Sequence, residues 1–204
     1  MQAPIRAEQL TILPANEASG GDLDAVFGTA DYPGRCRCQR FKVVGWFWRD
    51  TTQDERITML RGQTACGDPG AAATSGLVAY DDDEPAGWVA VEPRTAYPKL
   101  RTSPTPWRGR NEDKDDDGVW AVTCFAVRKG YRKRGLTYPL ARAAVDFARE
   151  RGATALEGYA MITEPGKEIT WGELHVGALS VYEEAGLRPV SRPSKRRVVM
   201  RIDF

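Results

Sequence analysis

The sequence has no long apolar run, almost no net charge and a single histidine, and each absence excludes a class of protein. No stretch approaches the roughly 18 apolar residues of a membrane-spanning helix. The opening residues MQAPIRAEQL lack the apolar segment of a secretory signal peptide. Lys and Arg total 29 against 28 Asp and Glu, so the net charge is +1. Because proteins that bind nucleic acid mainly through charge usually have a clear basic excess, we expect a cytoplasmic protein with neither a nucleic-acid nor a membrane partner.

The four cysteines do not form the pattern of a disulfide framework or of a metal site. Cys36 and Cys38 are separated by one residue, Cys66 and Cys124 stand alone, and the one histidine, His175, is distant in sequence. Without a secretory signal, we interpret the cysteines as free thiols in a reducing compartment. A Cys-x-Cys pair with one distant histidine is a poor ligand set for zinc, so we expect no metal.

The chain has 204 residues, 42% of them hydrophobic, which is enough for one core, and we expect a single domain over residues 1–204. The predicted strands are 10–15, a hairpin over 76–94, 119–127, 155–161 and 196–204; the predicted helices are 54–66, 136–152 and 175–186. Residues 38–49 are ambiguous between helix and strand. The order predicts a mixed α and β fold with an antiparallel start and a central strand–helix–strand unit.

Two stretches have the composition of long loops, residues 28–39 and 93–118. The second contains four prolines and a run of charged residues, which oppose regular structure. A loop of this length is either part of a binding site or a disordered insert, and the sequence leaves both open. Tyr97 and Trp107 within this loop are candidates to cover a bound substrate.

The segment VRKGYRKRGLTYPLARAA, residues 127–144, carries six positive charges and two glycines. Such cations fit a solvated helix face, a nucleic-acid patch or one wall of a phosphate site. The predicted strand ends near Val127 and the predicted helix begins near Leu136, so a glycine-containing turn leads into a helix N-terminus. Unpaired N–H groups and the helix dipole attract anions there, and Gly135 lets the backbone approach a ligand closely. A solvated face does not explain that glycine, so we favour a pyrophosphate site.

Residues 132–137, RKRGLT, resemble the R/Q-x-x-G-x-G/A motif of the GNAT acyltransferase superfamily, with Thr137 where the family prefers Gly or Ala. Residues 175–187, HVGALSVYEEAGL, resemble the family's N-x-x-A-x-x-x-Y-x-x-x-G-F helix, with His175 in place of Asn and Leu187 in place of Phe. Together the two motifs extend the resemblance over residues 119–204, whereas the first 70 residues match only in outline.

The resemblance implies an α/β (α+β) fold with a mixed, mostly antiparallel sheet of about six or seven strands flanked by helices. It implies acetyl-CoA as co-substrate and direct attack of a primary amine, from a small molecule or a peptide, on the thioester. In the family, the strand before the motif contacts the thioester and pantetheine, and the motif holds the pyrophosphate. The cofactor-binding residues so implied are Phe125, Ala126, Val127, Arg132, Lys133, Arg134, Gly135, Leu136 and Thr137.

The resemblance also implies a catalytic acid, because Tyr182 stands where many members carry the residue that protonates the leaving thiolate. A phenol suits this role, since it is neutral at pH 7 and its pKa is near that of a thiol; the alternative is a core tyrosine. The predicted strand 119–127 has no acid, so Glu92 and Glu157 are the nearest candidate bases, each open to being a paired structural acid. Deprotonation through water is a further route. We interpret Cys124 as a core residue rather than a nucleophile.

Two functions therefore stay open from the sequence: an N-acetyltransferase, and a GNAT-like module that binds acyl-CoA as a sensor without turnover. A homodimer is compatible with either.

Overall fold

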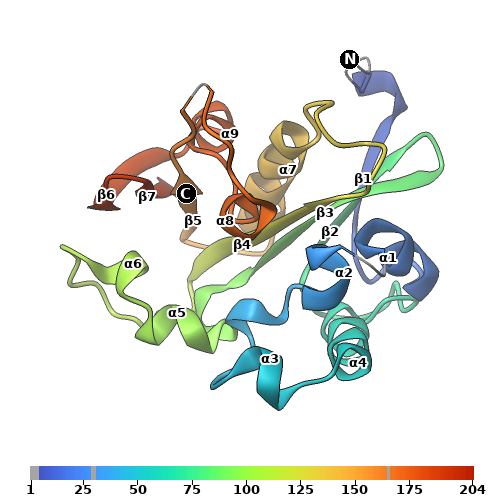
Figure 1. Ribbon diagram of the computed structural model, residues 1–204, viewed down its shortest axis with the longest axis horizontal. Helices are drawn as coiled ribbons and strands as arrows, with labels where there is room; N and C mark the ends of the chain where they lie inside the picture. The colour runs from blue at the N-terminus through green and yellow to red at the C-terminus, as the bar shows by residue number, and fades with distance from the viewer. Residues whose placement is uncertain (1–4, 29–30, 165) are drawn as a thin grey trace.

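The computed structural model describes residues 5–28, 31–164 and 166–204, and a seven-stranded sheet forms its centre (Figure 1). The strands are β1 Leu10–Pro14, β2 Gly76–Asp81, β3 Glu84–Pro93, β4 Val119–Val127, β5 Ala155–Met161, β6 Arg188–Ser194 and β7 Arg197–Asp203, in the spatial order β1-β2-β3-β4-β5-β7-β6. Only β4 and β5 are parallel neighbours among them. The predicted fold class is confirmed, with seven strands in a mostly antiparallel sheet.

Nine α-helices and three short 3-10 helices surround the sheet in the described part of the chain. They are η1 Ala7–Gln9, α1 Gly20–Phe27, α2 Tyr32–Cys36, η2 Gln39–Phe41, α3 Phe47–Asp50, α4 Gln53–Thr64, η3 Arg94–Ala96, α5 Pro98–Thr102, α6 Pro104–Trp107, α7 Thr137–Glu150, α8 Trp171–Leu174 and α9 Leu179–Glu184. No helix within the described residues is both long and apolar enough to cross a bilayer.

Each face of the sheet is covered by its own group of helices (Figure 1). On one face, α7 buries Leu140, Ala144 and Ala148 against alternate residues of β2 to β5, and α9 packs beside it. On the other face, α1 and α4 pack on Trp88 and its neighbours, with Leu60 buried there. The helix predicted over residues 136–152 is therefore confirmed as α7, which packs on the sheet.

Local sequence signals explain where the two N-terminal helices begin. Ser19 caps α1 and exchanges hydrogen bonds with Asp22 three residues later. Thr52 and Glu55 form the same reciprocal capping box at the start of α4. Such a box satisfies two backbone donors that the first helical turn leaves unpaired.

The structure differs from the sequence-based expectations in three places. The helix predicted over 175–186 begins only at Leu179, because Gly177 has φ +92 and Ala178 is extended. Residues 38–49 form neither one helix nor a strand: the short helices η2 and α3 lie on either side of Gly45, whose φ is +89. Strand β6 was not predicted, since it contains two prolines. As an edge strand paired only with β7, it tolerates them.

The 93–118 segment is ordered and folds back onto the protein through η3, α5 and α6. Leu100 and Tyr97 are each 1% exposed, and Trp107 is 9% exposed and donates from Nε1 to the Leu100 carbonyl at 2.6 Å. The disordered-insert alternative is therefore wrong. Tyr97 and Trp107 are buried packing residues, and neither lines a cavity wall on this side of the sheet.

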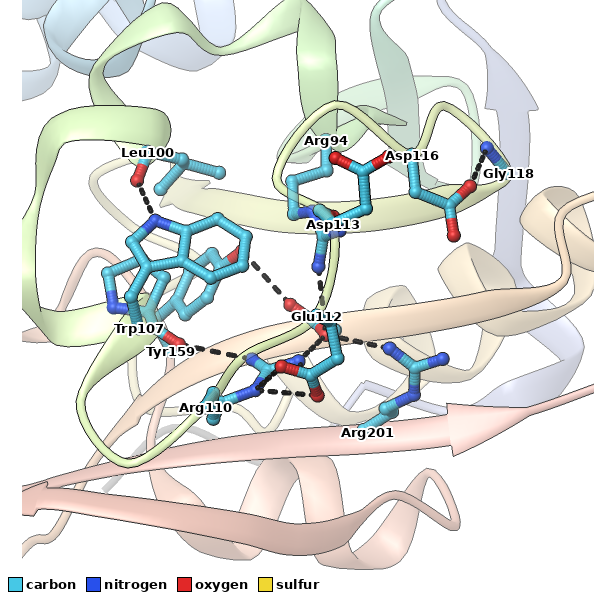
Figure 2. A network of polar contacts seen from close by, with 12 residues as sticks. Arg94, Leu100, Trp107, Arg110, Glu112, Asp113, Asp116, Gly118, Tyr159 and Arg201 are labelled. Carbon is cyan, nitrogen blue, oxygen red and sulfur yellow. Dashed lines mark hydrogen bonds and ion pairs between the residues drawn. The ribbon is translucent and has the colours of Figure 1, made fainter.

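A buried carboxylate, Glu157 on β5, anchors that segment to the sheet. Figure 2 shows three arginines that converge at this point, Arg94, Arg110 and Arg201. Its Oε1 atom pairs with Arg94, Arg110 and Arg201, at 3.2 Å for Arg94 and 3.0 Å for Arg201, and the side chain is fully buried. Tyr159 donates to its other oxygen at 3.3 Å. Three cations from distant parts of the chain thus meet at one anion, although Arg110 also pairs with Glu112 and Arg201 with Asp203.

Replacing Glu157 with Ala is expected to lower the free energy of unfolding by about 3–5 kcal/mol, because the buried Arg94 guanidinium loses its counter-charge and Arg110 and Arg201 each lose one of two carboxylate partners. Equilibrium urea unfolding measures the change. The matched control is Glu112→Ala: that carboxylate also pairs with Arg110 but is 45% exposed, so we expect a loss below about 1 kcal/mol. Equal losses in the two variants would contradict the special role of the buried carboxylate.

Candidate functional site

The sheet opens between β4 and β5. The two strands pair in parallel only from Val119–Ala155 to Val122–Gly158. Directly beyond that point, Thr123 is an extra residue opposite β3, where the register shifts between Ala90 and Val91. A bulge of this kind bends the strand and turns its backbone groups. The C-terminal half of β4 therefore diverges from β5, with one edge of its backbone no longer paired to that strand.

The chain's own segment 175–178 lies in this opening. The Phe125 N–H donates to the His175 carbonyl at 2.6 Å, and the Met161 N–H of β5 donates to the Gly177 carbonyl at 2.9 Å. Because N–H groups alternate along a strand, the Val127 N–H faces the same side as that of Phe125. The predicted thioester-contacting strand thus faces the opening, and the Phe125 N–H already binds a carbonyl oxygen there.

Tyr182 of α9 enters the same opening from the helical side. Its hydroxyl is buried and donates to the Val176 carbonyl at 2.6 Å, one residue from the carbonyl that Phe125 binds. Its ring has space only because Gly158 and Gly177 lack side chains: a Cβ on either would lie within 2.8 Å of the ring. Burial raises the pKa of Tyr182, with Cys124 adding to the effect, so the phenol stays protonated at neutral pH.

The predicted pyrophosphate motif, residues 132–137, lies in the loop that leads from β4 into α7 and ends on the first residue of that helix. Two arginines of this loop bind other parts of the protein. Arg132 donates to the Val127 carbonyl at 3.0 Å and pairs with Asp31, and Arg134 pairs with Asp81 at 2.8 Å. Lys133 is exposed and has φ +63. The cationic side chains therefore stabilise the turn more than the sequence suggested, so backbone N–H groups become the main candidates for holding a phosphate.

Gly135 fits a close approach of a ligand to the backbone. Its φ is +80, and the nearest atom to a Cβ built there is 4.0 Å away, so that side of the loop is open. No side chain caps the N-terminus of α7 behind it. A cavity of about 310 Å³ opens at Gly135 and Leu136, between Tyr138 of α7 and Glu184 of α9. An anion there would meet the uncapped helix end.

The candidate bases lie elsewhere. Glu92 pairs with Lys42 at the far end of β3, opposite Ala121, and that pairing is four residues along β4 from Phe125. At about 3.3 Å per residue this is roughly 13 Å. Burial raises the pKa of Glu92, although Lys42 acts in the opposite direction. Glu157 is the structural anion described above, so neither carboxylate reaches the Phe125 N–H.

The cysteines behave as the sequence predicted. All four are free thiols, and Cys124 is 3% exposed within the core of the sheet. Burial raises the pKa of Cys36 to about 12 and that of Cys124 well above its ordinary value. Cys38 accepts a hydrogen bond from Trp88 Nε1 at 3.1 Å. Cys124 is therefore an unreactive core residue.

A second cavity, of about 340 Å³, lies on the other side of the opening and was missed in the sequence. It is lined by Arg40, Phe41, Lys99, Leu100, Ser103, Thr105, Pro106, Tyr159, His175 and Arg197. His175 connects it to the opening, since its carbonyl binds the Phe125 N–H and its imidazole is part of the cavity wall. These residues are spread from position 40 to position 197, and no local motif joins them.

A family model described as the acetyltransferase (GNAT) family matches residues 40–164. The chain belongs to the GNAT acetyltransferase family. The matched region contains the hairpin β2–β3, the loop before α7, and the strands β4 and β5 that diverge to form the opening. No curated protein sequence matches this GNAT chain.

Solved structures support the fold assignment. The yncA protein of Salmonella typhimurium, described as an acetyltransferase and solved with its cofactor acetyl-CoA, has a TM-score of 0.54 at 13% identity, covering 96% of this chain and 94% of its own. A GCN5-related N-acetyltransferase from Kribbella flavida has a TM-score of 0.56 at 15% identity over 98% and 100% of the two chains. An N-acetyltransferase from Staphylococcus aureus has 0.53 at 12% over 95% and 98%.

Changing Gly135 to Val is expected to abolish detectable binding of acetyl-CoA, because the side chain would fill the open side of the loop. Gly152→Val is the matched control: Gly152 also has φ +80 and open space around its Cβ position, but it lies at the other end of α7. Both variants carry the same backbone strain, so stability should fall equally. Calorimetric titration with acetyl-CoA separates them, and unchanged affinity in a folded Gly135→Val protein would place the phosphates elsewhere.

Proposed function

We propose that this protein is an acetyl-CoA-dependent N-acetyltransferase that acetylates a primary amine by direct attack. One observation carries the proposal: the Phe125 N–H and the Tyr182 hydroxyl converge on the carbonyls of two adjacent residues, His175 and Val176. An N–H donor beside a phenolic donor is the pair that acyl transfer from a thioester requires. The two rings also contact each other edge to face, with centroids 6.0 Å apart.

Acetyl-CoA supplies the thioester whose C–S bond is exchanged for a C–N bond. The Phe125 N–H stabilises the negative charge that develops on the carbonyl oxygen. Tyr182 gives its proton to the sulfur that leaves, and the attacking nitrogen releases one proton, so the number of protons balances. The loop at Gly135 and the uncapped end of α7 hold the pyrophosphate. No carboxylate near Phe125 is positioned as a base, so we assign removal of the amine proton to water.

The 175–178 segment has to move for this reaction. The His175 carbonyl accepts a hydrogen bond from the Phe125 N–H, which a thioester oxygen would need as its donor. The Val176 carbonyl accepts the hydrogen bond of the Tyr182 hydroxyl. Binding therefore exchanges one acceptor for another at each donor, and such an exchange costs little net free energy because both states are hydrogen-bonded.

The same two contacts favour the second candidate function, an acyl-CoA-binding module without turnover. If the segment stays on both donors, acetyl-CoA can bind at the pyrophosphate loop without its thioester being activated. Release of free thiol from acetyl-CoA that depends on an added amine distinguishes the two functions. An enzyme releases thiol with at least one amine, whereas a sensor binds acetyl-CoA and releases none.

Replacing Tyr182 with Phe is expected to lower turnover roughly 10- to 1000-fold, the span of general-acid contributions. Acetyl-CoA affinity should change little, because the ring packing is kept and the hydroxyl lies away from the phosphate loop. Steady-state thiol release gives the turnover number, and calorimetry gives the affinity.

The control for this variant is Tyr80→Phe. The Tyr80 hydroxyl also binds a single acceptor, Asp22, at 3.1 Å, but it lies on β2, away from the opening. We expect wild-type turnover there. A Tyr182→Phe protein with an unchanged turnover number would leave Tyr182 as a packing residue only.

A further inference from the structure

The cavity beside His175 has an unusual charge distribution. Arg40, Lys99 and Arg197 line it, and none of the described residues in its wall is acidic. Across residues 5–28, 31–164 and 166–204, no carboxylate forms an ion pair with any of these three cations. Concave sites lined by charge of one sign attract ligands of the opposite sign.

Several guanidinium groups that are buried elsewhere in the protein pair with a carboxylate, whereas Arg56 donates to the Arg35 and Thr51 carbonyls. Arg37, Arg94 and Arg134 are 19% exposed or less, and each pairs with an acid. Arg197 is about half-buried and has none. Burial lowers its pKa, and the neighbouring charges of Arg196 and Arg40 lower it further, while Glu173 acts weakly in the opposite direction. Arg197 is thus held beside other cations at this cavity without a carboxylate partner among the described residues.

The cavity's other titratable wall group adds no positive charge. His175 is 5% exposed, and its Nδ1 lies 3.0 Å from the Gly172 carbonyl, which can only accept, so Nδ1 carries the proton. Burial, followed by Arg40, lowers the pKa of His175 to about 4. The imidazole is therefore neutral at pH 7. Its ring stacks on Phe41 with centroids 6.1 Å apart, which closes one side of the cavity with apolar surface.

The position of the cavity connects it to the chemistry. His175 contributes its carbonyl to the Phe125 N–H and its side chain to the cavity, so a molecule in the cavity lies one residue from the expected thioester position. At about 340 Å³ the space suits a small molecule rather than a protein surface.

From this arrangement we propose that the acceptor is a small amine that also carries an anionic group, held by Arg40, Lys99 and Arg197 with its amine directed toward Phe125. The proposal rests on the proposed function and names its substrate class. The shared chemistry is an anionic oxygen group, which is either a carboxylate or a phosphonate. Polycations and simple diamines are disfavoured, because they would add to the repulsion inside the cavity.

The test uses matched pairs of amines that differ only in charge. Glycine, leucine and phenylalanine are compared with their carboxamides, aminomethylphosphonate is compared with glycine, and cadaverine represents a cationic diamine. Binding to the protein saturated with CoA is measured by calorimetry, and thiol release from acetyl-CoA is measured separately. We expect at least one anionic amine to bind about tenfold or more tightly than its amide, and the phosphonate arm shows which anion is preferred.

Variants locate the effect. Lys99→Gln and Arg197→Gln are expected to weaken binding of the preferred anionic amine about tenfold to hundredfold and to reduce the preference over its amide. Acetyl-CoA affinity should not change. The matched control is Arg101→Gln on the same helix as Lys99; Arg101 is exposed, pairs with Asp115 and is not part of the cavity wall. Arg197→Glu, which reverses the charge, should shift the preference toward the amide.

The outcomes separate this proposal from the function on which it rests. Thiol release with amides or cadaverine in preference to every anionic partner would overturn the proposal and leave the acetyltransferase intact. Charge-selective binding without thiol release from any amine would support the proposal and overturn the acetyltransferase. No preference in any pair, or a preference that survives both Gln variants, would also overturn the proposal.

Discussion

The buried carboxylate of Glu157 is the interaction on which most of the candidate site depends. It lies on β5 and neutralises guanidinium groups from η3, from the segment after α6 and from β7. Desolvating one anion and three cations is costly, and the arrangement holds only because the remaining donors also find partners, such as the Asp113 carbonyl for Arg94. These ion pairs also affect the cavity beside His175. Arg110 and Arg94 fix both ends of the segment that carries Lys99, Leu100 and Thr105 into the cavity wall.

A second constraint is the bulge at Thr123, which ends the pairing of β4 with β5. An unpaired strand edge inside a protein must find hydrogen-bond partners. Here the partner is the segment 175–178, which satisfies Phe125, Met161 and Tyr182 together. The same groups that would act on a thioester are therefore satisfied in its absence. This explains how a fold can keep such donors in a buried opening without leaving them unpaired, and why the loop before α9 is long and contains Gly177.

Elements that are recognisable from a short stretch of sequence were predicted correctly. A hydrophobic pattern or a turn residue marks each of them: the hairpin, the apolar strand 119–127, the helix 136–152 and the glycine loop. The family motifs extended this to the placement of Tyr182 beside the central strand. The later start of α9 could be anticipated only from Gly177, whose positive φ depends on the packing of Phe125 and Tyr182 around it. The acceptor cavity could not be found in this way, because its wall comes from five separate segments that only the tertiary fold assembles.

The net charge of the chain does not show where positive and negative side chains lie relative to one another. The net charge of +1 argued against a nucleic-acid partner, because acids and bases balance over the whole chain. In the structure, several framework arginines are balanced by a carboxylate close to them. Arginines of the phosphate loop and of the Glu157 cluster are matched by acids, which leaves backbone N–H groups as the anion-binding elements near α7. Three cations without a carboxylate partner among the described residues, Arg40, Lys99 and Arg197, line the cavity at His175. An anionic ligand would reduce the repulsion between like charges there. Because the His175 carbonyl also binds the Phe125 N–H, this distribution of charge supports our proposal that the cavity recognises the acceptor.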